Sequence, residues 1–202
     1  DTVSGGAGND ELEFDAAVTL TTARTANISG FENLDLTTGS NITVNDAFLA
    51  ANPGIVIKPG ANGTIQGSTA TGDSLTTSLN VSADAAGVLS VLGGTGDDTV
   101  TFTHTNSLTA LDTVNGGAGT DTIYIRNDNG TNASVATSAV VDVNVSNVER
   151  IEVLDFALDD GGGSDIDIDM TVTINAGYTG AALTIDGSSQ DMHPTSLGGG
   201  EG

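Results

Sequence analysis

The chain has 202 residues, and 27 acidic residues against 4 basic ones give it a formal net charge of −23 at neutral pH. A charge of this sign and size disfavours nucleic acid and anionic membranes as partners and favours cations. No apolar run approaches ~18 residues, so no membrane insertion is expected. The chain has no cysteine, which excludes disulfides and thiol chemistry, and its 3% aromatic content favours a narrow, aliphatic interior over a thick globular core.

The chain opens with a glycine-rich stretch, Gly5 to Glu13, that follows the formula Gly-Gly-x-Gly-x-Asp-x-apolar-x, and the formula recurs at Gly93 to Thr101 and at Gly116 to Tyr124. Three glycines allow a turn whose carbonyl oxygens converge without obstruction by Cβ atoms. The aspartate adds a hard anionic oxygen, the ligand type that Ca²⁺ prefers. This formula is the repeat of a parallel β-helix wound around calcium, with the apolar residue pointing into the coil.

Short β-branched or alternating runs, separated by Gly, Asn, Asp, Thr and Ser, predict an almost entirely β chain. The predicted strands are Leu34–Leu36, Ile42–Val44, Ile55–Ile57, Leu79–Val81, Leu89–Leu92, Val100–Phe102, Ile123–Ile125, Val141–Val145, Ile151–Leu154, Val172–Ile174 and Leu183–Ile185. One helical turn is predicted at Asn45 to Ala51, capped by Asn45 or Asp46 and ended by Pro53. Such short, closely spaced strands suit a solenoid, although an antiparallel sandwich would give a similar pattern, and the glycine motifs favour the solenoid.

An internal repeat organises the chain. Asp1 to Asp10 matches Asp112 to Asp121, and Asn27 to Leu36 resembles Asn144 to Val153. We interpret residues 1–111 as the first copy of a tandem module and residues 112–202 as a second, truncated copy.

The final residues, Leu197 to Gly202, read as another Gly-Gly-x-Gly motif that stops before its aspartate. This pattern predicts that the chain is a fragment of a longer array, with a purposeful glycine-rich tail as the alternative.

The three glycine motifs resemble those of the repeat-in-toxin (RTX) family of secreted calcium-binding proteins, although the family's continuous tandem array is absent. The resemblance implies an all-β, right-handed parallel β-helix or β-roll with glycine-rich calcium-binding turns. Together with the elements Phe31 to Leu34 and Val148 to Ile151, the sparse motifs look most like those of bacterial surface-layer proteins and giant adhesins.

The second and third motifs predict a shared calcium site. Regular nonapeptide coils put turns on one side ~18 residues apart, whereas Gly93 and Gly116 are 23 residues apart, so we expect an insertion in one coil. If the two turns still stack, carbonyls and both aspartates would surround one ion. The expected ligands are Gly94, Gly96, Asp98, Gly117, Gly119 and Asp121. The alternative is a pair of tight turns with exposed aspartates.

Other acidic groups give weaker candidates. The first motif, with Gly6, Gly8 and Asp10, reads as a half-site completed by a preceding module. Alternation in a strand would put Asp165, Asp167 and Asp169 on one face, where they either bind a cation or form a solvated edge.

We therefore expect a non-catalytic, calcium-stabilised structural module of a large bacterial surface protein of the surface-layer type. The module would be extracellular, exported by type I secretion of its parent, and would fold when it meets external calcium. Expected partners are other copies or neighbouring modules, with cell-surface polysaccharide as a further candidate. The alternatives are an RTX adhesin unit that binds ice or carbohydrate, prompted by threonine runs such as Thr101 to Thr105, and a β-helical polysaccharide lyase or hydrolase using Asp159 and Asp160.

Overall fold

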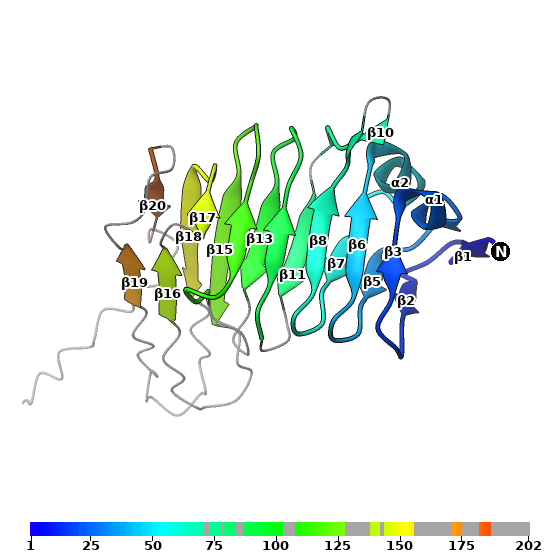
Figure 1. The fold of residues 1–202 in the computed structure, drawn as a ribbon, viewed down its shortest axis with the longest axis horizontal. Helices are drawn as coiled ribbons and strands as arrows, with labels where there is room; N and C mark the ends of the chain where they lie inside the picture. Colours follow the sequence, from blue (N-terminus) through cyan, green and yellow to red (C-terminus); the bar gives the residue numbers. More distant parts are fainter. Residues whose placement is uncertain are drawn as a thin grey trace, which may run out of the picture.

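A computed structural model describes residues 1–70, 73–77, 79–83, 87–102, 108–127, 138–141, 144–155, 171–174 and 182–186. These residues form a parallel β-helix, in which successive coils of the chain stack along one long axis (Figure 1). The expected all-β solenoid is thus confirmed. Among the described helices, none is long and apolar enough to cross a membrane.

Two parallel sheets carry most of the coils. The eight-stranded sheet contains, in spatial order, β2 (Glu11–Glu13), β5 (Asn33–Asp35), β7 (Val56–Lys58), β11 (Asn80–Ala83), β13 (Thr99–Phe102), β15 (Thr122–Asn127), β18 (Arg150–Asp155) and β20 (Thr184–Asp186). The six-stranded sheet contains β3 (Thr19–Leu20), β6 (Asn41–Val44), β8 (Thr64–Gly67), β12 (Ser90–Leu92), β14 (Thr113–Asn115) and β17 (Val145–Ser146).

Three further pairs lie outside these sheets. Strand β1 (Val3–Ser4) pairs in parallel with β4 (Ile28–Ser29), and β16 (Ser138–Val141) pairs in parallel with β19 (Thr171–Ile174). The pair β9 (Thr69–Ala70) and β10 (Asp73–Ser74) is antiparallel. The run Val141 to Val145, predicted as one strand, instead holds the end of β16, a turn at Asn144 and the start of β17.

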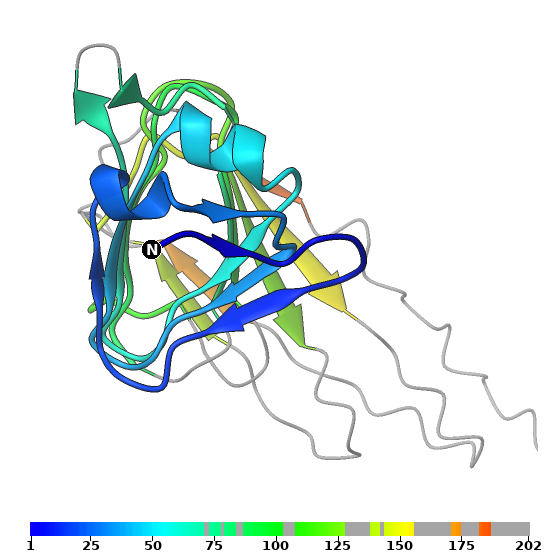
Figure 2. The same ribbon diagram turned by 90° about the vertical axis from the view of Figure 1, so that its right-hand side faces the viewer.

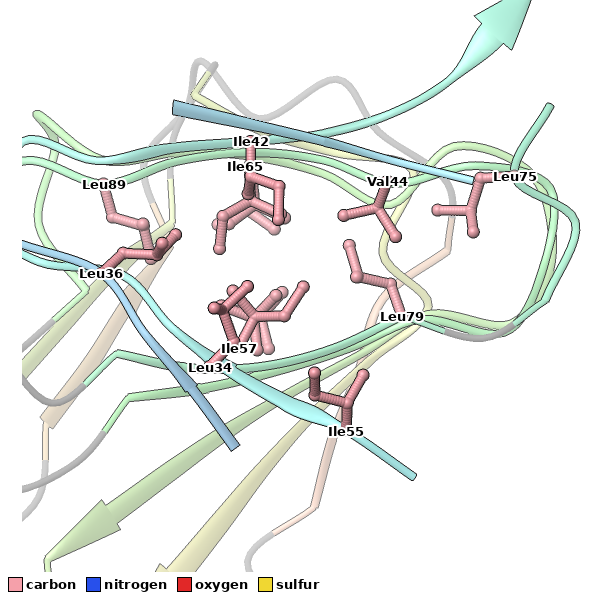
Figure 3. Packing of buried hydrophobic residues seen from close by; sticks show 14 of the residues in the cluster. Leu34, Leu36, Ile42, Val44, Ile55, Ile57, Ile65, Leu75, Leu79 and Leu89 are labelled. Carbon is pink, nitrogen blue, oxygen red and sulfur yellow. The ribbon is translucent and has the colours of Figure 1, made fainter. Parts of the chain in front are cut away.

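The interior consists of aliphatic rows contributed by equivalent positions of successive coils. In the eight-stranded sheet Leu34, Ile57 and Val81 stack in register, and all three are fully buried. In the six-stranded sheet Ile42 and Ile65 stack and point at the first row from the opposite side (Figure 3). Each such side chain contributes about 1.5–3 kcal/mol when fully buried. A cross-section this narrow explains why the chain needs so few aromatic residues.

The register gives the length of each coil. Leu34 pairs with Ile57 and Val100 pairs with Ile123, and both steps along the chain equal the spacing of the second and third glycine motifs. The step from Val81 to its partner Val100 is shorter. The spacing of the two glycine motifs is therefore an ordinary coil length in this solenoid. Extra residues were expected in one coil, whereas strands and corners outside the nonapeptide lengthen most coils beyond the regular ~18 residues.

Two short helices interrupt the coils on the same side near the N-terminal end (Figure 2). Helix α2 (Asp46–Ala51) is the predicted one, and the Asn45 side chain caps it by accepting a hydrogen bond from the Phe48 N–H at 2.9 Å. Helix α1 (Thr22–Thr25) was not predicted, because four residues with two β-branched threonines carry no helical periodicity. The two sheets continue without a break from the first copy into the second, through the pairs β12–β14 and β13–β15.

Candidate metal centre in the stacked glycine turns

The turns of residues 93–98 and 116–121 lie one above the other on the same corner of the solenoid. Each turn follows a strand of the six-stranded sheet and leads into a strand of the eight-stranded sheet. The Gly93 N–H donates to the Asn115 carbonyl at 2.8 Å, and the Ala118 N–H donates to the Gly94 carbonyl at 3.1 Å. The stacking that a shared site requires is therefore present.

Glycine is needed in the turn of residues 116–121 for two separate reasons. Gly117 and Gly119 have φ angles of +105° and +133°, which L-residues with side chains rarely adopt. A Cβ atom on Gly117 would overlap the carbonyl oxygen of Gly94, and one on Gly119 would come too close to that of Gly96. The carbonyl oxygens of Gly94 and Gly96 thus lie directly against the backbone of the turn of residues 116–121.

The two aspartates of these turns point inward. Asp98 and Asp121 are 3% and 2% exposed, so the alternative of tight turns with exposed aspartates is wrong. Asp98 Oδ1 accepts the Leu79 N–H at 2.7 Å, and its Oδ2 accepts the Gly94 N–H at 3.0 Å. Asp121 Oδ1 accepts the Asp98 N–H at 2.7 Å, whereas Asp121 Oδ2 is buried without a hydrogen-bond partner.

Burial dominates the electrostatics of both carboxylates. Loss of hydration raises the pKa of Asp98, against the opposing effect of its backbone N–H donors. Loss of hydration likewise raises the pKa of Asp121 to about 6, with smaller contributions from the nearby charges of Asp98, Glu149 and Asp97. A carboxylate in this position is stabilised either by a proton or by a cation.

Glu149 extends this arrangement by one coil, and sequence reasoning assigned it no role. Its Oε2 accepts the Asp121 N–H at 2.8 Å, so Asp98, Asp121 and Glu149 form a carboxylate ladder in which each side chain binds a backbone N–H of the preceding coil. In the first copy Glu32 makes the same bond to the Asp10 N–H, also at 2.8 Å. The signal was present in the internal repeat, because both glutamates occupy the same place in matching segments.

The first turn repeats the geometry of the third. Gly6 and Gly8 have φ angles of +99° and +139°, close to those of Gly117 and Gly119. Asp10 Oδ2, like Asp121 Oδ2, is buried without a hydrogen-bond partner. The same orphaned carboxylate oxygen therefore occurs at the same motif position in both copies.

These oxygens provide the test of whether calcium fits. Asp98, Asp121, Gly93 and Gly116 line one cavity of about 10 Å³, near the smallest volume that accommodates a single water-sized occupant, and most of the remaining lining is aliphatic: Val91, Val100, Val114, Ile123 and Val148. The donors at hand are carboxylate and carbonyl oxygens, which suit Ca²⁺ rather than a softer metal. The described residues contain no cluster of three or more His, Cys, Asp or Glu side chains, so any ion here would depend on backbone carbonyls. The oxygen types of the two turns suit calcium, but Gly94, Gly96, Gly117 and Gly119, the expected carbonyl ligands, do not line this cavity.

The remaining candidates lie outside the described residues. These are Asp165, Asp167 and Asp169 of the acidic strand, and Asp159 and Asp160 of the enzymatic alternative.

The chain was compared with models of protein families, with curated proteins and with solved structures. None of the three comparisons gives a match.

Proposed function

We propose that the chain is a non-catalytic structural module of a secreted bacterial surface protein, stabilised by calcium at its stacked glycine turns. The observation that carries this proposal is the partnerless, buried oxygen of Asp121, repeated at Asp10 one module earlier. A buried anionic oxygen without a donor is destabilising, and a bound cation removes that penalty. The net charge of −23 adds a general repulsion that multivalent cations relieve.

Ion-dependent folding follows from this arrangement. Where calcium is scarce, the buried carboxylates destabilise the folded chain and it is less compact. Where calcium is plentiful, binding to the folded state alone shifts the equilibrium towards it. Extracellular modules bind Ca²⁺ with dissociation constants of roughly 10⁻⁴–10⁻³ M, which places such a transition at the concentrations met outside a cell.

The test is thermal melting, followed by circular dichroism, in EDTA and then in millimolar Ca²⁺, with Mg²⁺ as the ion control. We expect Ca²⁺ to raise the melting temperature and the β-sheet signal well beyond Mg²⁺, because Mg²⁺ gives up its hydration water reluctantly. An equal response to both ions would reduce the effect to general charge screening.

A pair of matched variants locates the site. Asp121→Asn keeps the shape and the Oδ1 acceptor but removes the charge, so it should abolish most of the calcium response. Asp112→Asn is the control, because Asp112 is also fully buried but its carboxylate receives the N–H groups of Leu89 and Thr109 and the Thr109 hydroxyl. It should leave the calcium response intact. Loss of the response in both variants, or in neither, would refute the assignment.

One row of the eight-stranded sheet, which contains Thr99 and Thr122, counts against ice binding at that sheet. Thr99 and Thr122 are neighbours on the eight-stranded sheet, but Asn80 precedes them and Arg150 follows them in the same row. A flat ice-binding face needs one residue type repeated over many coils, and this row changes type after two.

A further inference from the structure

The N-terminal end of the solenoid presents a face made by strand β1, the turn of residues 5–10 and strand β2. We call this the first-coil face. Strand β2 is the edge of the eight-stranded sheet, and β1 pairs only with β4, so no described coil lies against the other side of either strand. Figure 2 looks onto this end of the molecule.

In the second copy, the equivalent strands β14 and β15 pair with strands β12 and β13 of the preceding coil. Val3 of the first copy is 42% exposed, whereas Val114, its equivalent in the second copy, is 1% exposed. The difference arises because Val114 pairs with Val91 of the preceding coil. Likewise Ile123 is fully buried beneath Val100, while its equivalent Leu12 is only partly buried.

The turns show the same contrast at the level of single atoms. The Gly117 and Gly119 backbones lie against the carbonyl oxygens of Gly94 and Gly96. Around Gly6, which has almost the same φ as Gly117, a Cβ atom would meet nothing within 4 Å. Around Gly8 it would meet only Asp10, from the same turn. The first turn thus has the backbone shape that packs against two carbonyl oxygens in the third turn. In the first turn no described atom occupies the places of those two oxygens.

The polar groups of the covering coil complete the comparison. In the second copy, the covering turn supplies the Asp97 carboxylate to the Thr120 N–H at 2.7 Å. It also supplies the Asp98 N–H to the Asp121 carboxylate at 2.7 Å. The equivalent groups of the first copy are the Asn9 N–H and the Asp10 carboxylate, and both belong to the first-coil face.

We propose that the first-coil face binds one further β-helical coil whose turn carries Gly-Gly-x-Gly-Asp-Asp, in the way that residues 89–102 cover the second copy. This inference rests on the modular role proposed above, but not on calcium. It assigns a partner to a surface and specifies its contacts: two carbonyls, one carboxylate, one N–H and two apolar side chains.

The experiment supplies that coil. A duplicate of residues 89–111 is fused ahead of Asp1, so that its last leucine precedes Asp1 as Leu111 precedes Asp112. Hydrogen exchange is then measured with and without the fusion, both in Ca²⁺. We expect the amides of Gly6 to Glu13 to exchange at least about tenfold more slowly in the fused chain, because local opening now breaks contacts to a second coil.

A double-mutant cycle gives the matched control. In the unfused chain, Gly6→Ala should destabilise the turn only through its positive φ angle, because no atom lies within 4 Å of the added Cβ. In the fused chain the same Cβ would overlap the carbonyl of the added turn, as it would at Gly117. We therefore expect Gly6→Ala to abolish the added protection in the fused chain and to cost much less in the unfused one.

Three outcomes would overturn the proposal: no added protection on fusion, equal protection from a fused coil of scrambled sequence, or additive effects of fusion and Gly6→Ala. Dimerisation of the unfused chain that is lost in Val3→Asp would assign the face to a second copy instead. Calcium dependence is judged separately, from the unfused chain in Ca²⁺ and EDTA, so the two proposals fail independently.

Discussion

The buried Asp121 carboxylate predicts that the pH dependence of stability reverses sign when calcium is added. In the folded chain its pKa is raised to about 6 from an ordinary value of 3.8, so the folded state holds the proton more tightly than the unfolded state does. Without calcium, the free energy of unfolding should fall as pH rises from about 4 to 6, and the loss is complete above pH 6. The difference between the two pKa values corresponds to at most about 3 kcal/mol at neutral pH.

Calcium should reverse this slope. A cation at Asp121 compensates the charged carboxylate and competes with the proton. In Ca²⁺ the stability should therefore be highest near neutral pH and fall as the pH drops through 6.

The assay is urea unfolding at half-unit steps from pH 4.5 to 7.5, in EDTA and in Ca²⁺, for the wild type and Asp121→Asn. Subtracting the variant from the wild type removes the titration of the many surface carboxylates. In EDTA at neutral pH the variant should be as stable as the wild type or more so, because it buries no charge. A variant that is less stable in EDTA at every pH, with a slope parallel to that of the wild type, would show that the Asp121 charge carries no penalty and would refute the reasoning.

Three further substitutions test the packing around the turns by urea unfolding. Gly117→Ala should cost roughly 2 kcal/mol or more beyond Gly39→Ala, since both glycines have positive φ but only Gly117 lies against a carbonyl, and equal costs would contradict the stacking. Asn52→Ala should cost about 3 kcal/mol, because the fully buried amide bonds three backbone groups, and a near-neutral result would contradict that role. Glu149→Ala should cost about 1–3 kcal/mol by leaving the Asp121 N–H unpaired, whereas Glu149→Gln should retain most of the stability.

The solenoid could be predicted from the sequence because its determinants are local. Short aliphatic runs such as Leu34 to Leu36 and Ile123 to Ile125 specify strands, and the glycine formula specifies the three corners at which it occurs. Coil length could not be obtained this way, because it depends on which strands pair, and the nonapeptide covers only one corner and one strand of each coil that contains it.

The interior of the candidate centre was harder to predict. The formula identifies Asp98 and Asp121 as oxygen donors, but it does not reveal that both lie inside the coil and accept backbone N–H groups. Those N–H groups belong to the preceding coil, far back along the chain, so the contact appears only once the register is known. Glu149 was missed for the same reason, since its partner is also a full coil away.

The carboxylate ladder of Asp98, Asp121 and Glu149 gives the solenoid a chemical direction. In every step the acceptor belongs to the later coil and the donor to the earlier one. Two N-terminal ends brought face to face would set one Asp10 carboxylate against the other, so a symmetric contact does not continue the ladder. A contact that continues the ladder through this end is therefore heterologous, head to tail, and its repetition gives an open, polar filament rather than a closed two-fold dimer.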